Sequence, residues 1–149
     1  MSVQTTGVVD ILLVEDNTAD ARLMQEALSD ARINGRLRVA RDGEEAIAFL
    51  RQQAPFAGAY RPDLILLDLN LPRKNGRDVL AEIKADDSLQ SIPVVVLTTS
   101  QAGQDIHHAY QLHVNCYIVK PVDLEEFFSL MKTIEHYWFQ TARLPREAE

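Results

Sequence analysis

The chain has 149 residues, 46% of them hydrophobic, which suits one ordinary core and leaves little room for a second domain. A formal charge of −7 and a pI near 5.1 argue against nucleic-acid binding, which depends on clustered Lys and Arg. No apolar stretch approaches the roughly 20 residues that span a bilayer, the N-terminus lacks a signal-peptide pattern, and Cys116 is the single cysteine, so we expect a cytoplasmic protein without membrane partners.

Short apolar runs predict strands, and segments with helical periodicity separate them. The predicted strands are residues 9–14, 36–41, 63–68, 93–98 and 116–120. The helical segment 103–113 has the weakest apolar face, formed mainly by Ile106 and Ala109. The last helix has the clearest start, because Asp123 and Glu126 resemble a capping box. This alternation predicts an α/β fold with a doubly wound, five-stranded parallel sheet.

Acidic residues follow two of the predicted strands. Glu15 and Asp16 come directly after the first strand, and Asp68 ends the third. In the order 2-1-3-4-5 of a flavodoxin-like (βα)5 fold, these strands are neighbours where the strand order reverses, which is where such sheets bind ligands. Three converging carboxylates would repel unless a cation lay among them, and Mg²⁺ suits such a group. The alternative is that Asp16 or Asn17 caps the following helix.

Thr98 and Lys120 end the fourth and fifth strands at the same edge. A carboxylate can attack phosphorus, and phosphoryl transfer needs chiefly positioning and neutralised charge. Asp68 would then accept a phosphoryl group whose oxygens contact the metal, Lys120 and Thr98. Two alternatives stay open: a binding module that has abandoned phosphorylation, and a Mg²⁺-dependent aspartate phosphatase, although such enzymes usually carry the nucleophile after the first strand.

A zinc site is a further alternative. Its ligands would be His107, His108, His113 and Cys116. Their spacing matches no common zinc pattern, and a solvated helix face with one small buried cysteine is the simpler explanation.

The segments "VEDN", "LLDLNLPRKNG", "VVVLTTS" and "YIVKPV" occur in this order along the chain. They resemble the receiver domain of two-component response regulators, the CheY-like family, over residues 9–138. The resemblance implies that Asp68 is the phosphoacceptor. It also implies that Glu15 and Asp16 hold Mg²⁺, with the backbone carbonyl of Asn70 as a further ligand.

The resemblance implies a switch as well. A sensor histidine kinase would donate the phosphoryl group, the hydroxyl of Thr98 would move inward, and the ring of Tyr117 would follow. The face formed by the fourth helix, fifth strand and fifth helix would then change for a downstream protein whose identity is unknown. Such a protein is no enzyme with a separate substrate, but a phosphoacceptor that assists its own phosphorylation and dephosphorylation. The peptide between Lys120 and Pro121 is expected in the cis form.

Residues 1–8 and 139–149 are interpreted as terminal extensions, and no output domain is expected beside the receiver domain. The long loop "QQAPFAGAYRP" (52–62), the segment "LNLPRKNGRDVL" and a last helix extended through "HYWFQ" resemble the regulators that pair with cyanobacterial phytochrome histidine kinases. The role of the loop stays open.

Apolar positions of the last helix cover an arc of roughly 200°, about twice what packing on a sheet requires. Leu130 and Tyr137 form one flank of this arc, and Phe128 and Phe139 form the other. An exposed apolar flank usually marks an interface, so we predict a homodimer through this helix. The alternative is that the loop or the tail covers the excess.

Overall fold

Five parallel strands form one sheet in the order β2-β1-β3-β4-β5, which confirms the predicted fold class. The computed structural model describes residues 9–29, 36–141 and 144–145, and for 29 and 139–141 it describes the backbone alone. The strands are β1 (Ile11–Val14), β2 (Leu37–Ala40), β3 (Leu64–Leu67), β4 (Val94–Thr98) and β5 (Cys116–Val119). Every residue of β1, β3 and β4 is buried, which explains their nearly continuous apolar sequences.

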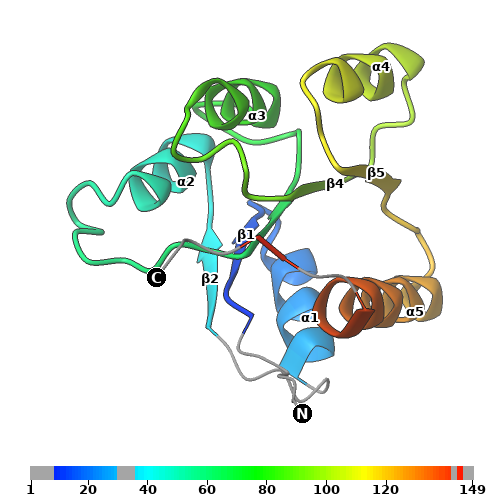
Figure 1. The fold of residues 1–149 in the computed structure, drawn as a ribbon. Helices are drawn as coiled ribbons and strands as arrows, with labels where there is room; N and C mark the ends of the chain where they lie inside the picture. The colour runs from blue at the N-terminus through cyan, green and yellow to red at the C-terminus, as the bar shows by residue number, and fades with distance from the viewer. Residues whose placement is uncertain (1–8, 30–35, 142–143, 146–149) are drawn as a thin grey trace.

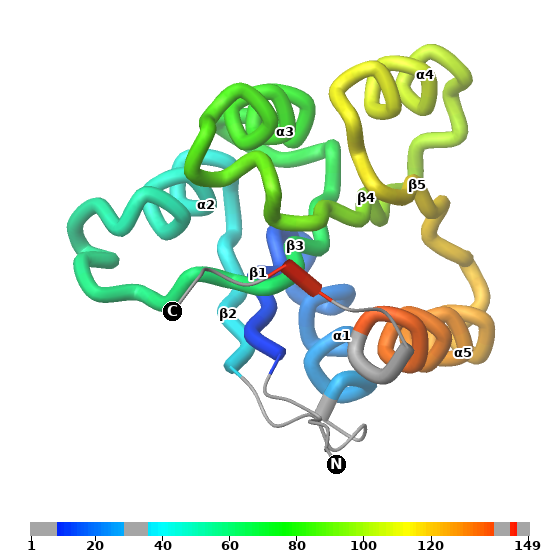
Figure 2. The backbone as a smooth tube through the Cα atoms, in the orientation of Figure 1, coloured from blue at the N-terminus to red at the C-terminus, as the bar shows by residue number. Residues whose placement is uncertain are grey.

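Helices cover both faces of the sheet (Figures 1 and 2). They are α1 (Thr18–Ser29), α2 (Gly43–Leu50), α3 (Gly76–Ala85), α4 (Gly103–Gln111), α5 (Leu124–Glu135) and the π-helical η1 (His136–Thr141). Side chains alternate along the strands, so Leu12 and Val14 face the core beneath α2 and α3, whereas Ile11 and Leu13 face the core beneath α1 and α5. This arrangement brings the carboxyl ends of all strands to one edge.

Side chains cap the start of four helices: Asn17 caps α1, Asp42 caps α2, Asn75 caps α3 and Asp123 caps α5. The Oδ1 atom of Asn17 accepts a hydrogen bond of 3.0 Å from the backbone N–H of Asp20, so Asn17 caps α1. Asp123 caps α5, as the sequence predicts, but it accepts from the N–H of Glu125 at 3.0 Å rather than from that of Glu126, the partner in the predicted capping box. Because Asn17 supplies the cap of α1, Asp16 is left for another role.

The 52–62 loop folds back onto the core beside α2. The rings of Phe56 and Tyr60 meet that of Phe49 edge to face, with centroids 5.5 Å and 5.2 Å away. The hydroxyl of Tyr60 donates a hydrogen bond of 2.9 Å to the backbone oxygen of Ile11. The loop is therefore anchored to both a helix and a strand.

The peptide between Lys120 and Pro121 is trans, so the expected cis form is wrong. Within the described part of the chain, the cis peptide bond joins Ala54 to Pro55. The two forms of a bond before proline differ by only about 0.5–1 kcal/mol, so a short motif does not decide between them.

The predicted extension 1–8 lies outside the described residues, and η1 carries the helical path of α5 into the start of the predicted extension 139–149. None of the helices within the described ranges combines the length and apolar content needed to cross a membrane.

Candidate functional site

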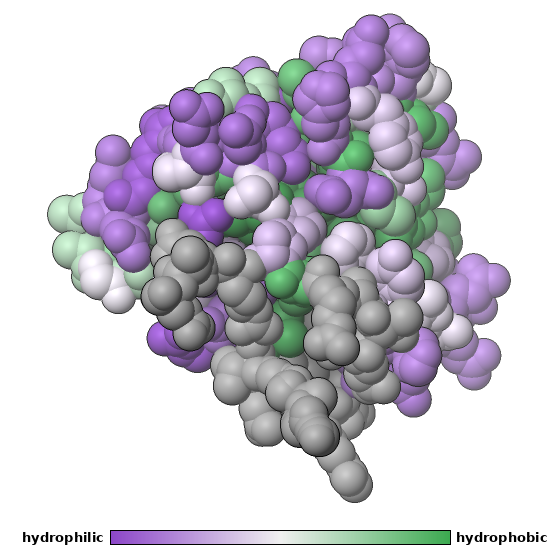
Figure 3. Space-filling model, in the orientation of Figure 1, coloured by the Kyte–Doolittle hydropathy of each residue, from purple (hydrophilic) through white to green (hydrophobic). Residues whose placement is uncertain are grey.

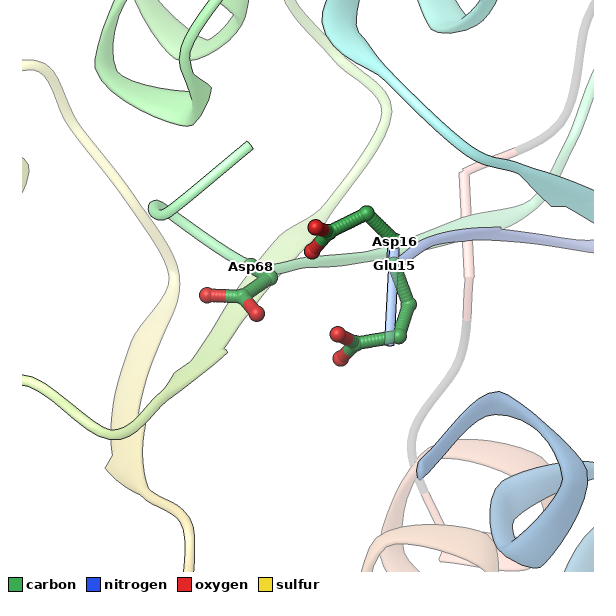
Figure 4. A group of neighbouring side chains, drawn as sticks. All are labelled: Glu15, Asp16 and Asp68. Atoms are coloured by element: carbon green, nitrogen blue, oxygen red, sulfur yellow. The ribbon is translucent and has the colours of Figure 1, made fainter. Parts of the chain in front are cut away.

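Three carboxylates meet at the carboxyl edge of the sheet, as Figure 4 shows. Glu15 and Asp16 follow β1, and Asp68 follows β3. Val14 and Leu67 are partners in the register of these neighbouring strands, so the residues after them emerge side by side. One oxygen from each carboxylate lies within 4.8 Å of the other two. The structure therefore brings together the three acids that the sequence singled out.

Lys120 follows β5 and reaches into this group. Its Nζ atom donates to Oε1 of Glu15 at 2.6 Å, to Oδ2 of Asp20 at 2.9 Å and to Oδ2 of Asp68 at 3.2 Å. Sequence reasoning missed Asp20, which lies in the first turn of α1. The available signal was an acid in the first turn of a helix that begins directly after the acid pair.

Burial and charge oppose each other in this group. The side chain of Glu15 is 1% exposed, and burial raises its pKa to about 7 although Lys120 acts to lower it. Burial also disfavours the charged form of Lys120, but its hydrogen bonds to Glu15 and Asp20 outweigh this and raise its pKa above the ordinary value. Lys120 therefore stays charged, yet one ammonium does not balance the surrounding carboxylates.

A divalent cation suits the remaining negative charge. Hard cations such as Mg²⁺ prefer oxygen ligands, and this edge supplies three carboxylates. Among the described residues, the carboxylates of Glu15, Asp16 and Asp68 are the one group of three or more His, Cys, Asp or Glu side chains that lie close enough together to hold a metal ion. The histidines at the end of α4 and Cys116 form no such set there, which removes the support for a zinc site.

Thr98 and Asn70 connect the ends of β3 and β4. The side chain of Thr98 is buried, and its Oγ1 accepts a hydrogen bond of 3.4 Å from Nδ2 of Asn70. The backbone N–H of Asn70 donates to Oδ1 of Asp68 at 3.0 Å. The hydroxyl that the sequence assigned to the site is therefore linked to Asp68 through Asn70.

Gly76, the first residue of α3, packs directly against the turn that carries Asp68. Its N–H donates to the backbone oxygen of Leu69 at 2.9 Å. A Cβ atom at Gly76 would lie 2.2 Å from the backbone oxygen of Asp68 and 2.5 Å from Cα of Leu69. Any side chain here would displace the backbone of Asp68, so this close approach requires glycine.

Tyr117 is held at its hydroxyl by the loop after β4. The hydroxyl donates to the backbone oxygen of Ser100 at 3.0 Å, and Oγ of Ser100 donates to Asp105 of α4 at 2.6 Å. Nε and Nη2 of Arg77, on α3, donate to the same carboxylate at 3.0 Å and 2.8 Å. Sequence reasoning identified Tyr117 but missed this network, which joins α3, the loop and α4.

The predicted interface residues differ in exposure. Tyr137 is 52% exposed, whereas Phe128 and Leu130 are half-buried against the core beneath α1 and α5. Leu144 packs against the same core, so part of the C-terminal tail does cover this side. The side chain of Phe139 lies outside the described residues.

Comparisons with known proteins agree with this geometry. The model of the response regulator receiver domain family matches residues 11–132. Response regulator Rcp1 of Synechocystis sp. is 53% identical over 135 residues, which cover 91% of this chain and 92% of Rcp1.

Two solved structures are similar as well. The Mn²⁺-bound form of Rcp1 has a TM-score of 0.90 and 51% identity over 93% of this chain and 99% of that one. The phosphorylated cyanobacterial phytochrome response regulator RcpA has a TM-score of 0.91 and 56% identity over 94% of this chain and 100% of that one. The chain therefore belongs to the response regulator receiver domain family.

Proposed function

We propose that this protein is a response regulator that accepts a phosphoryl group from a sensor histidine kinase onto Asp68. The observation that carries the proposal is the position of the Asp68 carboxylate, 3.2 Å from Nζ of Lys120 and within the group of three acids. A carboxylate oxygen of Asp68 would form the bond to phosphorus while the bond between phosphorus and the histidine nitrogen breaks. The chain would thus assist its own phosphorylation and dephosphorylation rather than act on a separate substrate.

The metal would be Mg²⁺, held by the carboxylates of Glu15, Asp16 and Asp68 and by the backbone carbonyl of Asn70. Bound Mg²⁺ would neutralise charge on the phosphoryl oxygens. Mg²⁺ commonly binds through few protein oxygens and keeps sites for water and phosphate, as this partly open acid group allows. The Mn²⁺-bound form of the relative Rcp1 supports a divalent ion in this family.

Lys120 would hold a second phosphoryl oxygen, and the hydroxyl of Thr98 would hold a third. For Thr98 to do so, its hydroxyl must exchange the long 3.4 Å contact with Asn70 for the phosphoryl group. Tyr117, now held at Ser100, would respond by moving its ring toward the space that Thr98 leaves. The surface of α4, β5 and α5 would change with it and alter binding of a downstream protein.

The upstream partner would be a phytochrome histidine kinase. RcpA, described as a cyanobacterial phytochrome response regulator, is 56% identical to this chain. The chain also matches nearly the whole of RcpA and Rcp1, which supports a receiver domain over residues 9–138. We expect it to act in the cytoplasm.

The protein would form a homodimer through α5 and its neighbours. The large apolar side chains that are exposed in the described ranges are Tyr110, Val122, Leu124 and Tyr137, of which Leu124 and Tyr137 belong to α5 and η1. Figure 3 shows apolar surface at the right of the view, between α4 and α5. Contiguous exposed apolar surface favours association.

Incubation with acetyl phosphate and Mg²⁺, followed by intact mass measurement, tests the phosphoacceptor. We expect the addition of one phosphoryl group with release of acetate, and peptide mapping should assign it to Asp68. EDTA should prevent the reaction, and Asp68→Asn should abolish it. Modification without a divalent metal, or in the Asp68→Asn variant, would contradict the proposal. An unmodified wild type that still binds its partner would favour a phosphorylation-independent binding module.

A further inference from the structure

The ammonium of Lys120 has three hydrogens, and three carboxylates accept from it. Glu15, Asp20 and Asp68 lie at 2.6, 2.9 and 3.2 Å from Nζ, and the lysine side chain is 4% exposed. An ammonium can donate three hydrogen bonds, so these contacts use its full capacity. Together they fix the direction of each N–H group.

Two of these acceptors have other tasks in the proposed function. Glu15 belongs to the metal-binding group, and Asp68 becomes an acyl phosphate. Both must therefore change their interaction with Lys120 during the reaction. Asp20 is not a member of that group and is not phosphorylated, so its hydrogen bond to Lys120 can persist in every state.

We propose that Asp20 is a positioning residue, which holds the Lys120 ammonium in place so that its N–H toward Asp68 meets the incoming phosphoryl oxygen. The inference rests on the proposed role of Asp68 as phosphoacceptor. Small displacements of a group that contacts reacting atoms can slow a reaction by up to about a hundredfold. Loss of the Asp20 carboxylate alone, with Lys120 still present, should slow phosphorylation by roughly tenfold.

Other effects of Asp20 predict different results. As an acid in the first turn of α1, it stabilises the positive helix end, and removing it should lower the melting temperature. As a negative charge beside the site, it repels an anionic phosphodonor, and removing it should make phosphorylation faster. A slower reaction in a folded variant is therefore the signature of positioning.

The test compares initial rates of phosphorylation by acetyl phosphate at saturating Mg²⁺. We expect Asp20→Asn to be about tenfold slower than wild type and Asp20→Glu to recover much of the rate, because its carboxylate can still reach Lys120. The matched control is Asp78→Asn, which removes an exposed acid from the first turn of α3 and should react like wild type. The double variant Ala19→Asp, Asp20→Asn restores an acid to the first turn of α1 and so controls for a loss of helix stability. Its phosphorylation should remain slow.

Measuring the same substitution in the Lys120→Ala variant shows whether Asp20 acts through Lys120. In Lys120→Ala, the further change Asp20→Asn should produce no additional slowing, because there is no ammonium left to position. Equal or faster phosphorylation of Asp20→Asn, or an undiminished loss in the Lys120→Ala background, would overturn the inference while leaving Asp68 as phosphoacceptor. A wild type that is not modified at Asp68 would instead defeat the proposed function and the inference with it.

Discussion

The charge of Lys120 stabilises the carboxyl edge of the sheet in the absence of metal. Its ammonium contacts the carboxylates of Glu15 and Asp68, which follow β1 and β3, and of Asp20 in α1, and the side chains of Glu15 and Asp68 are 1% and 8% exposed. Buried acids of this kind are costly without a cation. Lys120 therefore offsets part of the negative charge of these carboxylates permanently, and a divalent ion would offset more of it when bound.

Lys120→Ala should destabilise the protein by about 3 kcal/mol in EDTA, because buried carboxylates lose their cation. Saturating Mg²⁺ should raise the melting temperature of the variant more than that of wild type, since the metal then has no competing ammonium. Thermal unfolding with and without Mg²⁺ measures both effects. The control is Lys132→Ala, which removes an exposed lysine of α5. An equal rise in melting temperature with Mg²⁺ in wild type and Lys120→Ala would contradict the idea that Lys120 and the metal offset the same negative charge.

The acids and Lys120 could be recognised in the sequence because each stands at the end of a strand, and parallel strands deliver their carboxyl ends to one edge. Asp20 could not be recognised in the same way, because its contact depends on how α1 packs against the sheet. The long hydrogen bond between Asn70 and Thr98 likewise depends on a loop conformation. The predicted strands therefore identify the residues at the strand ends, whereas contacts made by helices and loops, such as that of Asp20, require the structure.

Helix α4 is attached to the molecule mainly by polar contacts. Ala109 is its one buried residue within the described chain, as the weak apolar face of 103–113 led us to expect. The paired hydrogen bonds between Arg77 and Asp105 join α4 to α3. Ser100, in the loop after β4, also donates a hydrogen bond to Asp105. No sequence pattern indicated this pairing, because the two charged residues are far apart in the chain.

Arg77→Ala should loosen α4 without unfolding the sheet. A partly exposed, bidentate ion pair is worth about 1 kcal/mol, so hydrogen exchange should become faster in α4 while α1 and α5 keep their protection. Arg73→Ala is the control, since Arg73 contacts Asp42 at 3.5 Å rather than α4. Unchanged exchange in α4 would show that the pair does not hold the helix.

The same ion pair has a defined pH dependence. The hydrogen bonds from Arg77, and then that from Ser100, hold the pKa of Asp105 below its ordinary value. Its stabilising contribution is therefore present above the ordinary pKa of an aspartate and is lost as the pH falls through the lowered value. In Arg77→Ala, NMR titration of the Asp105 carboxyl carbon should give a higher pKa than in wild type. An identical pKa in both proteins would show that the guanidinium does not set it.

At the scale of the whole molecule, the side formed by α5 and η1 carries exposed apolar side chains. Every residue of the edge strand β5 is half-buried, in contrast to the fully buried β1, β3 and β4. Leu124 and Tyr137 are 53% and 52% exposed, and Tyr137 stacks edge to face on Trp138 with centroids 5.2 Å apart. The hydrophobic arc of the last helix, visible in the sequence, is thus only partly covered within the described chain.

If this side forms the proposed homodimer, the wild type should sediment as a dimer at micromolar concentrations, because burying exposed apolar rings is the driving force for association. Leu130→Asp with Tyr137→Asp should give a monomer. Leu130 is half-buried in the core, so Leu124→Asp with Tyr137→Asp, at two exposed positions, separates loss of association from misfolding. Ala57→Asp, at an exposed position of the 52–62 loop, adds one charge away from this side and should leave the dimer intact. A wild type that stays monomeric at tens of micromolar, both with and without phosphorylation, would rule the dimer out. Dissociation of the Ala57→Asp control would show that added charge alone explains the loss of the dimer.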